Sequence, residues 1–391
     1  MKFRNLAIVA LLLVLGGSGC RNQDVANSVE SLPNQISVPP TKPSPFPSEM
    51  TFRLRRMLSD KVESWKLPGA VIYIATSDGD WSAVNGTADL SAQTPLQPTD
   101  RFRTGGLSEL FISVICLQLV EEGTLDLNDP IANWLPAAVS QRISNSKKIT
   151  IKQLLNHTSG LPDPYDKAFQ QAVNADPTHV WQPQEVLSYL ADRPTTALDQ
   201  FSFSNANYVL LGMIVERATG SSLATAIRNR VSDRLSLKNT FLEVEEKIPG
   251  GFVQGYQDWN EDGTTESVTK PLLNTALGLG DAGIISSAPD LAKFFRGLFI
   301  SNTLLYPRSL DTMLAPVDTD EGGYGLGIAR IPTAWGEAWG QMSKTTGFSS
   351  VILYLPVHDL IVVVWTNSGD QETEAVYEIA RRSLRIILGV P

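Results

Sequence analysis

The side chains that most often carry chemistry are few in this chain of 391 residues. Its three histidines, His157, His179 and His358, stand far apart, and the two cysteines are Cys20 and Cys116. A protein zinc site needs several such ligands at short spacing. We therefore expect no metal and no other cofactor, and we expect His157, in a polar turn, to make a structural hydrogen bond.

Composition narrows the range of partners. With 42% apolar and 19% charged residues the chain can bury a large core, and its formal net charge is −9. Binding of nucleic-acid phosphates requires a concentrated basic face, and no basic run is present. We therefore expect no nucleic-acid partner.

The N-terminus has the pattern of an export signal. Two basic residues precede a ten-residue apolar run at 6–15, and small residues follow up to Cys20. The run is too short to span a membrane and is typical of a signal peptide over residues 1–19. Cys20 resembles the lipidated cysteine of a bacterial lipobox, so we expect attachment to the membrane of the cell envelope or periplasm through a lipid on Cys20. Plain secretion is the alternative.

Residues 20–47 are expected to form a lipid-anchored linker. The segment from 21 to 47 is polar and contains six prolines, which prevent regular hydrogen-bonded structure. It is either a spacer between membrane and body or a tail without a role. The folded domain is expected to cover residues 48–391.

Periodicity predicts the elements that must position any functional residue. A helix capped by Ser48 should end near Pro68, and a hairpin should follow with strands at 70–76 and 81–86. Helices are expected at 107–122, 150–156, 184–192, 205–218 and 222–234, strands at 325–330, 349–355 and 360–366, and a last helix at 372–388. Early and late strands around a helical middle predict an α/β (α+β) fold with an inserted all-helical region.

Four stretches stand out: the sequence reads IKQLLNHTSGLP at 151–162, FSNANYVLLG at 203–212, SAPDLAKF at 287–294 and GFSS at 347–350. These stretches resemble the serine β-lactamase and D-Ala-D-Ala carboxypeptidase superfamily, in its class C and penicillin-binding-protein-like branch. The resemblance implies an antiparallel sheet flanked by helices. It also implies serine hydrolase chemistry of the β-lactamase, D,D-carboxypeptidase or esterase type.

The family's nucleophile and base are a serine and a lysine three residues later at a helix start. Three residues turn about 300°, so both groups share one helix face. Matched outward from Phe102 and Phe111, the serine position holds Gly106 and the lysine position holds Glu109. Ser108 does not restore the motif, because it points about 200° away from Gly106.

The two other family motifs are altered as well. The proton-shuttling tyrosine of Tyr-x-Asn is matched by Phe203, which cannot carry a proton, although Asn205 is present and could bond an amide. The late-strand lysine or histidine, seven residues before Phe348, is matched by Gln341. An alternative register uses Lys344, which would lie in the connection before the next strand.

These positions predict a protein without the family's catalysis, which binds a peptidoglycan fragment or an envelope protein. The Gly106 N–H at the helix start remains available for binding, whereas Glu109 disfavours carboxylate ligands. The first alternative is an active serine hydrolase with a displaced nucleophile, which needs a serine within reach of a base. The second makes Glu109 a general base that activates water.

Overall fold

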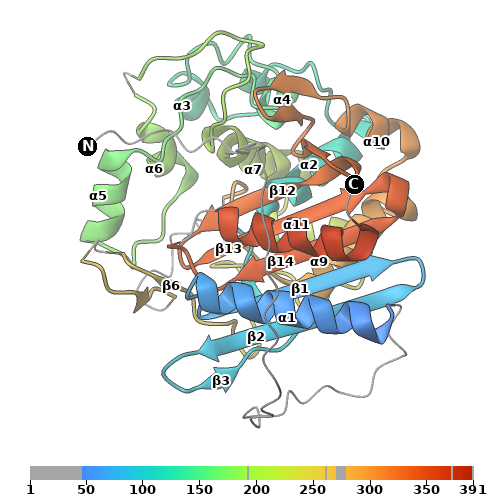
Figure 1. The fold of residues 1–391 in the computed structure, drawn as a ribbon. Coiled ribbons are helices and arrows are strands. Elements are labelled where there is room, and N and C mark those ends of the chain that lie inside the picture. The colour runs from blue at the N-terminus through green and yellow to red at the C-terminus, as the bar shows by residue number, and fades with distance from the viewer. Residues whose placement is uncertain (1–45, 192, 260–261, 270–278, 371–372, 390–391) are drawn as a thin grey trace, which may run out of the picture.

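The fold is described from a computed structural model, which describes residues 46–191, 193–259, 262–269, 279–370 and 373–389 (Figure 1). The expected signal peptide, Cys20 and nearly all of the linker lie outside these residues. Within them, no helix is both long and apolar enough to cross a bilayer.

One nine-stranded antiparallel sheet joins the two ends of the domain. Its strand order is β3-β2-β1-β14-β13-β12-β11-β10-β9, so β1 from the N-terminal hairpin pairs with β14 from the C-terminal region. The strands are β1 (Gly69–Thr76), β2 (Gly79–Asp89), β3 (Thr94–Pro95), β9 (Val317–Thr319), β10 (Gly322–Tyr324), β11 (Ala329–Thr333), β12 (Gly336–Thr345), β13 (Phe348–Leu355) and β14 (Leu360–Thr366). The mixed α/β class and the antiparallel sheet are as expected.

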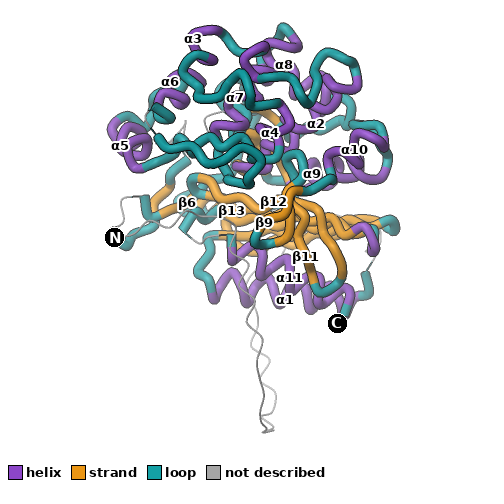
Figure 2. The backbone as a smooth tube through the Cα atoms, turned by 90° about the horizontal axis from the view of Figure 1, so that it is seen from above, coloured by secondary structure: helices purple, strands orange, loops and turns teal. Residues whose placement is uncertain are grey.

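Two helices cover one face of this sheet, and the helical region covers the other (Figure 2). The first pair is α1 (Ser48–Ser64) and α11 (Glu374–Leu388). Alternation along β1 explains both layers, since Ile72 and Ile74 pack toward α1 and α11 while Val71 and Ala75 pack toward the helical side.

The helical side holds most of the remaining helices. They are α2 (Ser108–Glu121), α3 (Ala137–Ser140), α4 (Ile151–Leu155), α5 (Lys167–Ala175), α6 (Pro183–Ser188), α7 (Ala206–Thr219), α8 (Leu223–Ile227), α9 (Ala288–Phe295) and α10 (Pro307–Met313). Single helical turns are η1 (Gly105–Leu107), η2 (Ile131–Asn133), η3 (Arg228–Ser232), η4 (Arg296–Ile300) and η5 (Pro356–His358).

Two small sheets complete the fold. The order β4-β8-β5 joins β4 (Arg101–Arg103), β8 (Ile284–Ser287) and β5 (Phe241–Leu242), and β6 (Tyr256–Gln257) pairs with β7 (Glu266–Ser267). A bidentate ion pair from Arg103 to Glu243, with the Arg103 side chain 1% exposed, holds the end of β4 in place. Since β4 leads directly into η1 and α2, this pairing fixes the start of α2.

Three local expectations were wrong. Ser48 is the first helical residue, and Pro47 occupies the cap position without a side-chain hydrogen bond. The strand expected at 325–330 is largely the turn between β10 and β11, where Gly325, Leu326 and Gly327 interrupt the ladder. Lys344 lies within β12 rather than in a connection, because β12 continues to Thr345 before a tight turn at Gly347.

Candidate functional site

The start of α2 lies directly against β12. The Gly106 N–H donates a hydrogen bond of 2.7 Å to the Ser343 hydroxyl on β12. Gly105 has φ +56°, and an ideal Cβ there would lie 2.3 Å from the same hydroxyl, so the position requires glycine. The expected free N–H at Gly106 is therefore occupied within the protein itself.

Glu109 lies beneath this helix start in a fully buried cluster. Its Oε2 atom accepts hydrogen bonds from the Tyr324 hydroxyl at 2.9 Å and from Gln341 Nε2 at 3.4 Å. His157 Nε2 is also 3.4 Å from that oxygen. The side chains of Glu109 and His157 are 0% exposed, and Gln341 is 4% exposed. Two of the matched positions, Glu109 and Gln341, are thus in direct contact.

The hydrogen bonds of His157 fix its tautomer. Its Nδ1 atom accepts from the Ser204 backbone N–H at 3.3 Å and from the Asn207 side-chain amide at 2.9 Å. The ring proton of the neutral imidazole therefore lies on Nε2 and is donated to Glu109. Asn207 is oriented in turn by the Ser159 hydroxyl, which donates to its Oδ1 at 2.5 Å. His157 makes the expected structural hydrogen bonds, but at the centre of the candidate site.

Phe203 and Asn205 lie nearer the surface, just before α7. The Phe203 side chain is 37% exposed, and its ring lies 4.5 Å from the His157 ring between centroids. The Asn205 amide donates to both carboxylate oxygens of Asp163, at 3.0 and 3.2 Å. The Asn205 amide, which could otherwise bond a ligand amide, is therefore engaged with an acid.

Two more acids and a tyrosine line the same region. The Tyr165 hydroxyl donates to Asp281 Oδ2 at 2.5 Å. Burial is the main cause that raises the pKa of Asp281 to about 7, and the negative charges of Glu109 and Asp163 raise it further. Burial also raises the pKa of Asp163. Glu109 and Asp163 are therefore both close enough to Asp281 for their charges to act on it.

Tyr324 is a member of this cluster that sequence reasoning missed. Burial, followed by the charge of Glu109, raises the pKa of Tyr324 well above its ordinary value. It therefore stays protonated and serves as a donor to Glu109. Only the pairing of β10 with β11 brings it there, and no motif in the chain marks it.

The alternative that uses Lys344 is not supported by the strand geometry. Gln341 and Ser343 lie on the face of β12 that meets α2, and Lys344 is one residue out of step with them. Because side chains alternate along a strand, Lys344 points to the opposite face, and it is exposed there.

Three serine hydroxyls next to the matched positions are bonded to backbone groups. Ser108 donates to the Gly105 carbonyl at 2.7 Å, Ser204 donates to the Pro162 carbonyl at 2.9 Å, and Ser343 accepts from Gly106. Ser108 and Ser204 therefore use their hydroxyl protons in structural hydrogen bonds. In the described part of the chain, no group of three or more His, Cys, Asp or Glu side chains is arranged to hold a metal ion.

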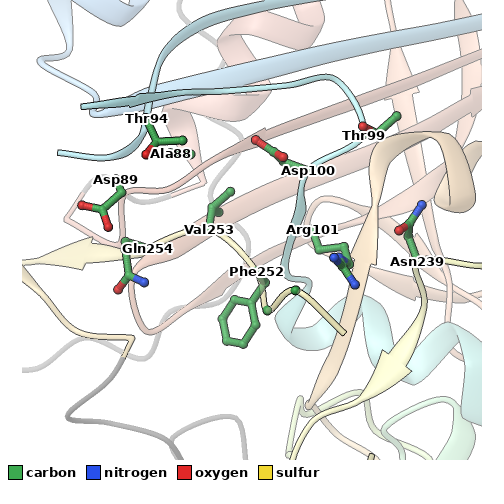
Figure 3. A pocket seen from close by; sticks show the side chains of 12 residues that line it. Ala88, Asp89, Thr94, Thr99, Asp100, Arg101, Asn239, Phe252, Val253 and Gln254 are labelled. Carbon is green, nitrogen blue, oxygen red and sulfur yellow. The ribbon is translucent and has the colours of Figure 1, made fainter. Parts of the chain in front are cut away.

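A separate hollow of about 550 Å³ lies beyond β2 and β4. Figure 3 shows its polar lining, with Asp89 and Gln254 at one end and Arg101 and Asn239 at the other. None of the residues matched to the catalytic motifs lines it. The hollow and the Glu109 cluster are therefore different places in the fold.

Comparison with known proteins agrees with the resemblance. The penicillin-binding protein 4* of Bacillus subtilis is 24% identical over 346 residues, which cover 84% of this chain and 74% of that protein. The flp protein of Staphylococcus aureus is 28% identical over 248 residues, 61% of this chain, and the chain spans about half (47%) of its length.

Solved structures give the same result. A D-stereospecific amidohydrolase from Streptomyces sp. superposes with a TM-score of 0.73 at 27% identity, covering 83% of this chain and 97% of that one. The D-amino acid amidase of Ochrobactrum anthropi SV3 superposes with a TM-score of 0.77 at 22% identity, covering 87% and 99%. The beta-lactamase family model matches residues 54–385. This chain therefore belongs to the beta-lactamase family, within the superfamily of β-lactamase-like serine hydrolases.

Proposed function

We propose that this protein is a non-catalytic binding member of its family, which recognises peptidoglycan fragments at the cell envelope. The observation that carries the proposal is the environment of Glu109. Where the family resemblance implies a lysine beside a serine, a buried carboxylate accepts hydrogen bonds from Tyr324 and Gln341. A carboxylate that accepts hydrogen bonds from such donors is a weaker base than a free amine, and position 106 offers it no hydroxyl to deprotonate.

The backbone at Gly106 supports the same proposal. Acyl transfer in this family needs a hydroxyl at that position and backbone donors turned toward the developing oxyanion. Gly106 offers no hydroxyl, and its N–H donates to Ser343. Loss of a nucleophile alone typically costs about a millionfold in rate.

The place of action in this proposal is the cell envelope. A signal peptide over residues 1–19 would direct export and be removed. A lipid on Cys20 would then hold the folded domain near a membrane through the proline-containing linker. Intact-mass measurement of the mature protein tests this. We expect a Cys20 terminus carrying acyl mass, and an unmodified terminus would exclude the lipid anchor.

A second candidate is an active hydrolase with a displaced nucleophile. The names of several relatives favour it, among them the unguisins hydrolase ungD of Aspergillus violaceofuscus, 24% identical over 255 residues, and the Streptomyces amidohydrolase. Ser343 is the hydroxyl nearest to the Gly106 N–H and is the first position to test. The other alternative, an active enzyme that uses Glu109 to activate water, is tested by ester hydrolysis in the experiment that follows.

The deciding experiment is intact-mass labelling of the full chain with benzylpenicillin and with a fluorophosphonate, alongside calorimetric titration with soluble peptidoglycan fragments. The proposal expects saturable binding without covalent mass. Acylation of any serine would support the displaced-nucleophile enzyme, and its loss in Ser343→Ala would identify the residue. Hydrolysis of an ester panel above the buffer rate, lost in Glu109→Gln, would instead support the water mechanism.

A further inference from the structure

Three buried acceptor atoms in the candidate site have no hydrogen-bond partner among the described residues. They are Glu109 Oε1, Gln341 Oε1 and Asp281 Oδ1. Their side chains are 0%, 4% and 1% exposed, respectively. A buried polar atom without a partner is costly, and native proteins leave few of them. All three of these atoms are oxygens, so the group that would satisfy them is a hydrogen-bond donor.

The charges around these atoms favour a cationic donor. Glu109 and Asp163 both raise the pKa of Asp281 through their negative charge, so both carboxylates lie close enough to act on Asp281. The donors already present bond other oxygens, since Tyr324 and His157 contact Glu109 Oε2 and Tyr165 bonds Asp281 Oδ2. The free oxygen of Asp281 therefore lies in a negative environment, and the free oxygen of Glu109 belongs to one of the acids that create it.

Gly106 leaves space at the start of the helix that carries Glu109. An ideal Cβ on Gly106 would meet a single neighbouring atom within 4 Å, the Ser343 hydroxyl at 3.6 Å. Gly106, Asp163 and Asn205 are partly exposed, whereas Glu109 and Gln341 are buried. The more exposed side of the cluster is therefore the side that carries Gly106, Asp163 and Asn205.

From these observations we infer that the site binds its ligand by a protonated primary amine, with the ammonium group between Glu109, Gln341 and Asp281. This inference rests on the proposed binding function and names the ligand class. A primary ammonium has three N–H donors, which matches the three free acceptor oxygens in number. A ligand carboxylate is disfavoured at the same place, because Glu109 repels it and Ser343 already occupies the Gly106 N–H.

Three small probes separate the possible recognition modes. D-alaninamide carries an ammonium and no carboxylate, N-acetyl-D-alanine carries a carboxylate and no ammonium, and N-acetyl-D-alaninamide carries neither. Binding of each to the full chain is measured by calorimetry and by the shift of the melting temperature at pH 7.5. We expect D-alaninamide to bind at least about tenfold more tightly than either acetylated probe, since a charge-assisted hydrogen bond is worth about that much.

Two charge-neutralising variants locate the ammonium. Glu109→Gln and Asp281→Asn should each weaken D-alaninamide binding about tenfold or more and leave the weak binding of N-acetyl-D-alaninamide unchanged. Asp100→Asn is the matched control, because Asp100 lines the separate hollow of Figure 3. It should leave all three affinities unchanged. Circular dichroism verifies that each variant is folded, and either of the two site variants suffices if the other does not fold.

The inference is overturned if N-acetyl-D-alanine binds as tightly as D-alaninamide, if no amine binds, or if folded Glu109→Gln retains full amine affinity. These outcomes leave the proposed non-catalytic function standing, provided peptidoglycan fragments still bind without acylation. Covalent labelling by benzylpenicillin would overturn the proposed function instead, whatever the amine affinities are. The two failures are therefore distinguishable.

Discussion

Restoring the family's side chains should give much faster acylation when Ser343 is also removed. The first variant carries Gly106→Ser, Glu109→Lys, Phe203→Tyr and Gln341→His. The second adds Ser343→Gly. The comparison isolates the hydrogen bond of 2.7 Å between the Gly106 N–H and the Ser343 hydroxyl, which both the parent chain and the first variant retain.

The structure sets the size of the expected difference. A serine side chain fits at position 106, because an added Cβ meets only the Ser343 hydroxyl at 3.6 Å, an ordinary contact. The backbone N–H of residue 106 is, however, already bonded, and one missing oxyanion donor costs about 10² to 10³ in rate. We therefore expect Ser343→Gly to raise the acylation rate of the four-residue variant by about 10² to 10³.

The assay is the second-order rate constant for labelling by a fluorescent penicillin, with intact mass to count the acyl groups. Circular dichroism confirms folding, since Glu109→Lys places an ammonium in a site that now holds a carboxylate. Ser343→Gly alone is the control and should show no labelling. Equal rates with and without Ser343→Gly would refute the claim that Ser343 blocks the backbone donor.

Three further perturbations test the packing around the site. Glu109→Ala leaves buried donors such as the Tyr324 hydroxyl without an acceptor. It should lower the free energy of unfolding, measured by urea titration, by about 3 kcal/mol or more. Glu109→Gln keeps an acceptor oxygen, so an equally large loss in that variant would contradict this reasoning. The pKa of Asp281 is about 7 in the folded protein and about 4 in the unfolded chain, so the folded state binds the extra proton and the free energy of unfolding should fall as the pH rises from about 4 to about 7. Asp281→Asn should reduce this pH dependence in urea titrations. An unchanged dependence would exclude Asp281 as its source. Arg103→Ala leaves the buried Glu243 carboxylate without its partner and should lower the free energy of unfolding by about 3–5 kcal/mol. Arg330→Ala, at a pair with the exposed Asp318, should lower it by less than about 1 kcal/mol. Similar losses in the two variants would show that burial of the first pair does not matter.

The elements were predictable where their signal is local. The hairpin of β1 and β2 follows from β-branched residues around a turn, and α2, α7 and α11 follow from apolar spacing and were expected within a few residues. The errors occurred where local patterns are ambiguous. The expected strand at 325–330 combined a glycine-containing turn with the start of β11, because pairing partners rather than composition decide where a short ladder is interrupted.

The candidate site, like the elements, was predictable only where the signal is local in the sequence. The spacing of Gly106 and Glu109 on one helical face, and the match of Gln341 seven residues before Phe348, follow from the sequence, since both are short-range counts. Whether Gln341 or Lys344 meets the helix was settled by the register of β12, in which Gln341 reaches Glu109.

The bonding inside the site is a matter of tertiary structure alone. Tyr324 and Gln341 contact Glu109 from positions 215 and 232 residues away along the chain, and Ser343 contacts Gly106 across 237 residues. A pattern within one segment cannot predict such long-range contacts, because they depend on how the central sheet packs against the helical layer. The sequence by itself determined which side chains we match to the family's positions, and only the packed fold decided what each of them bonds.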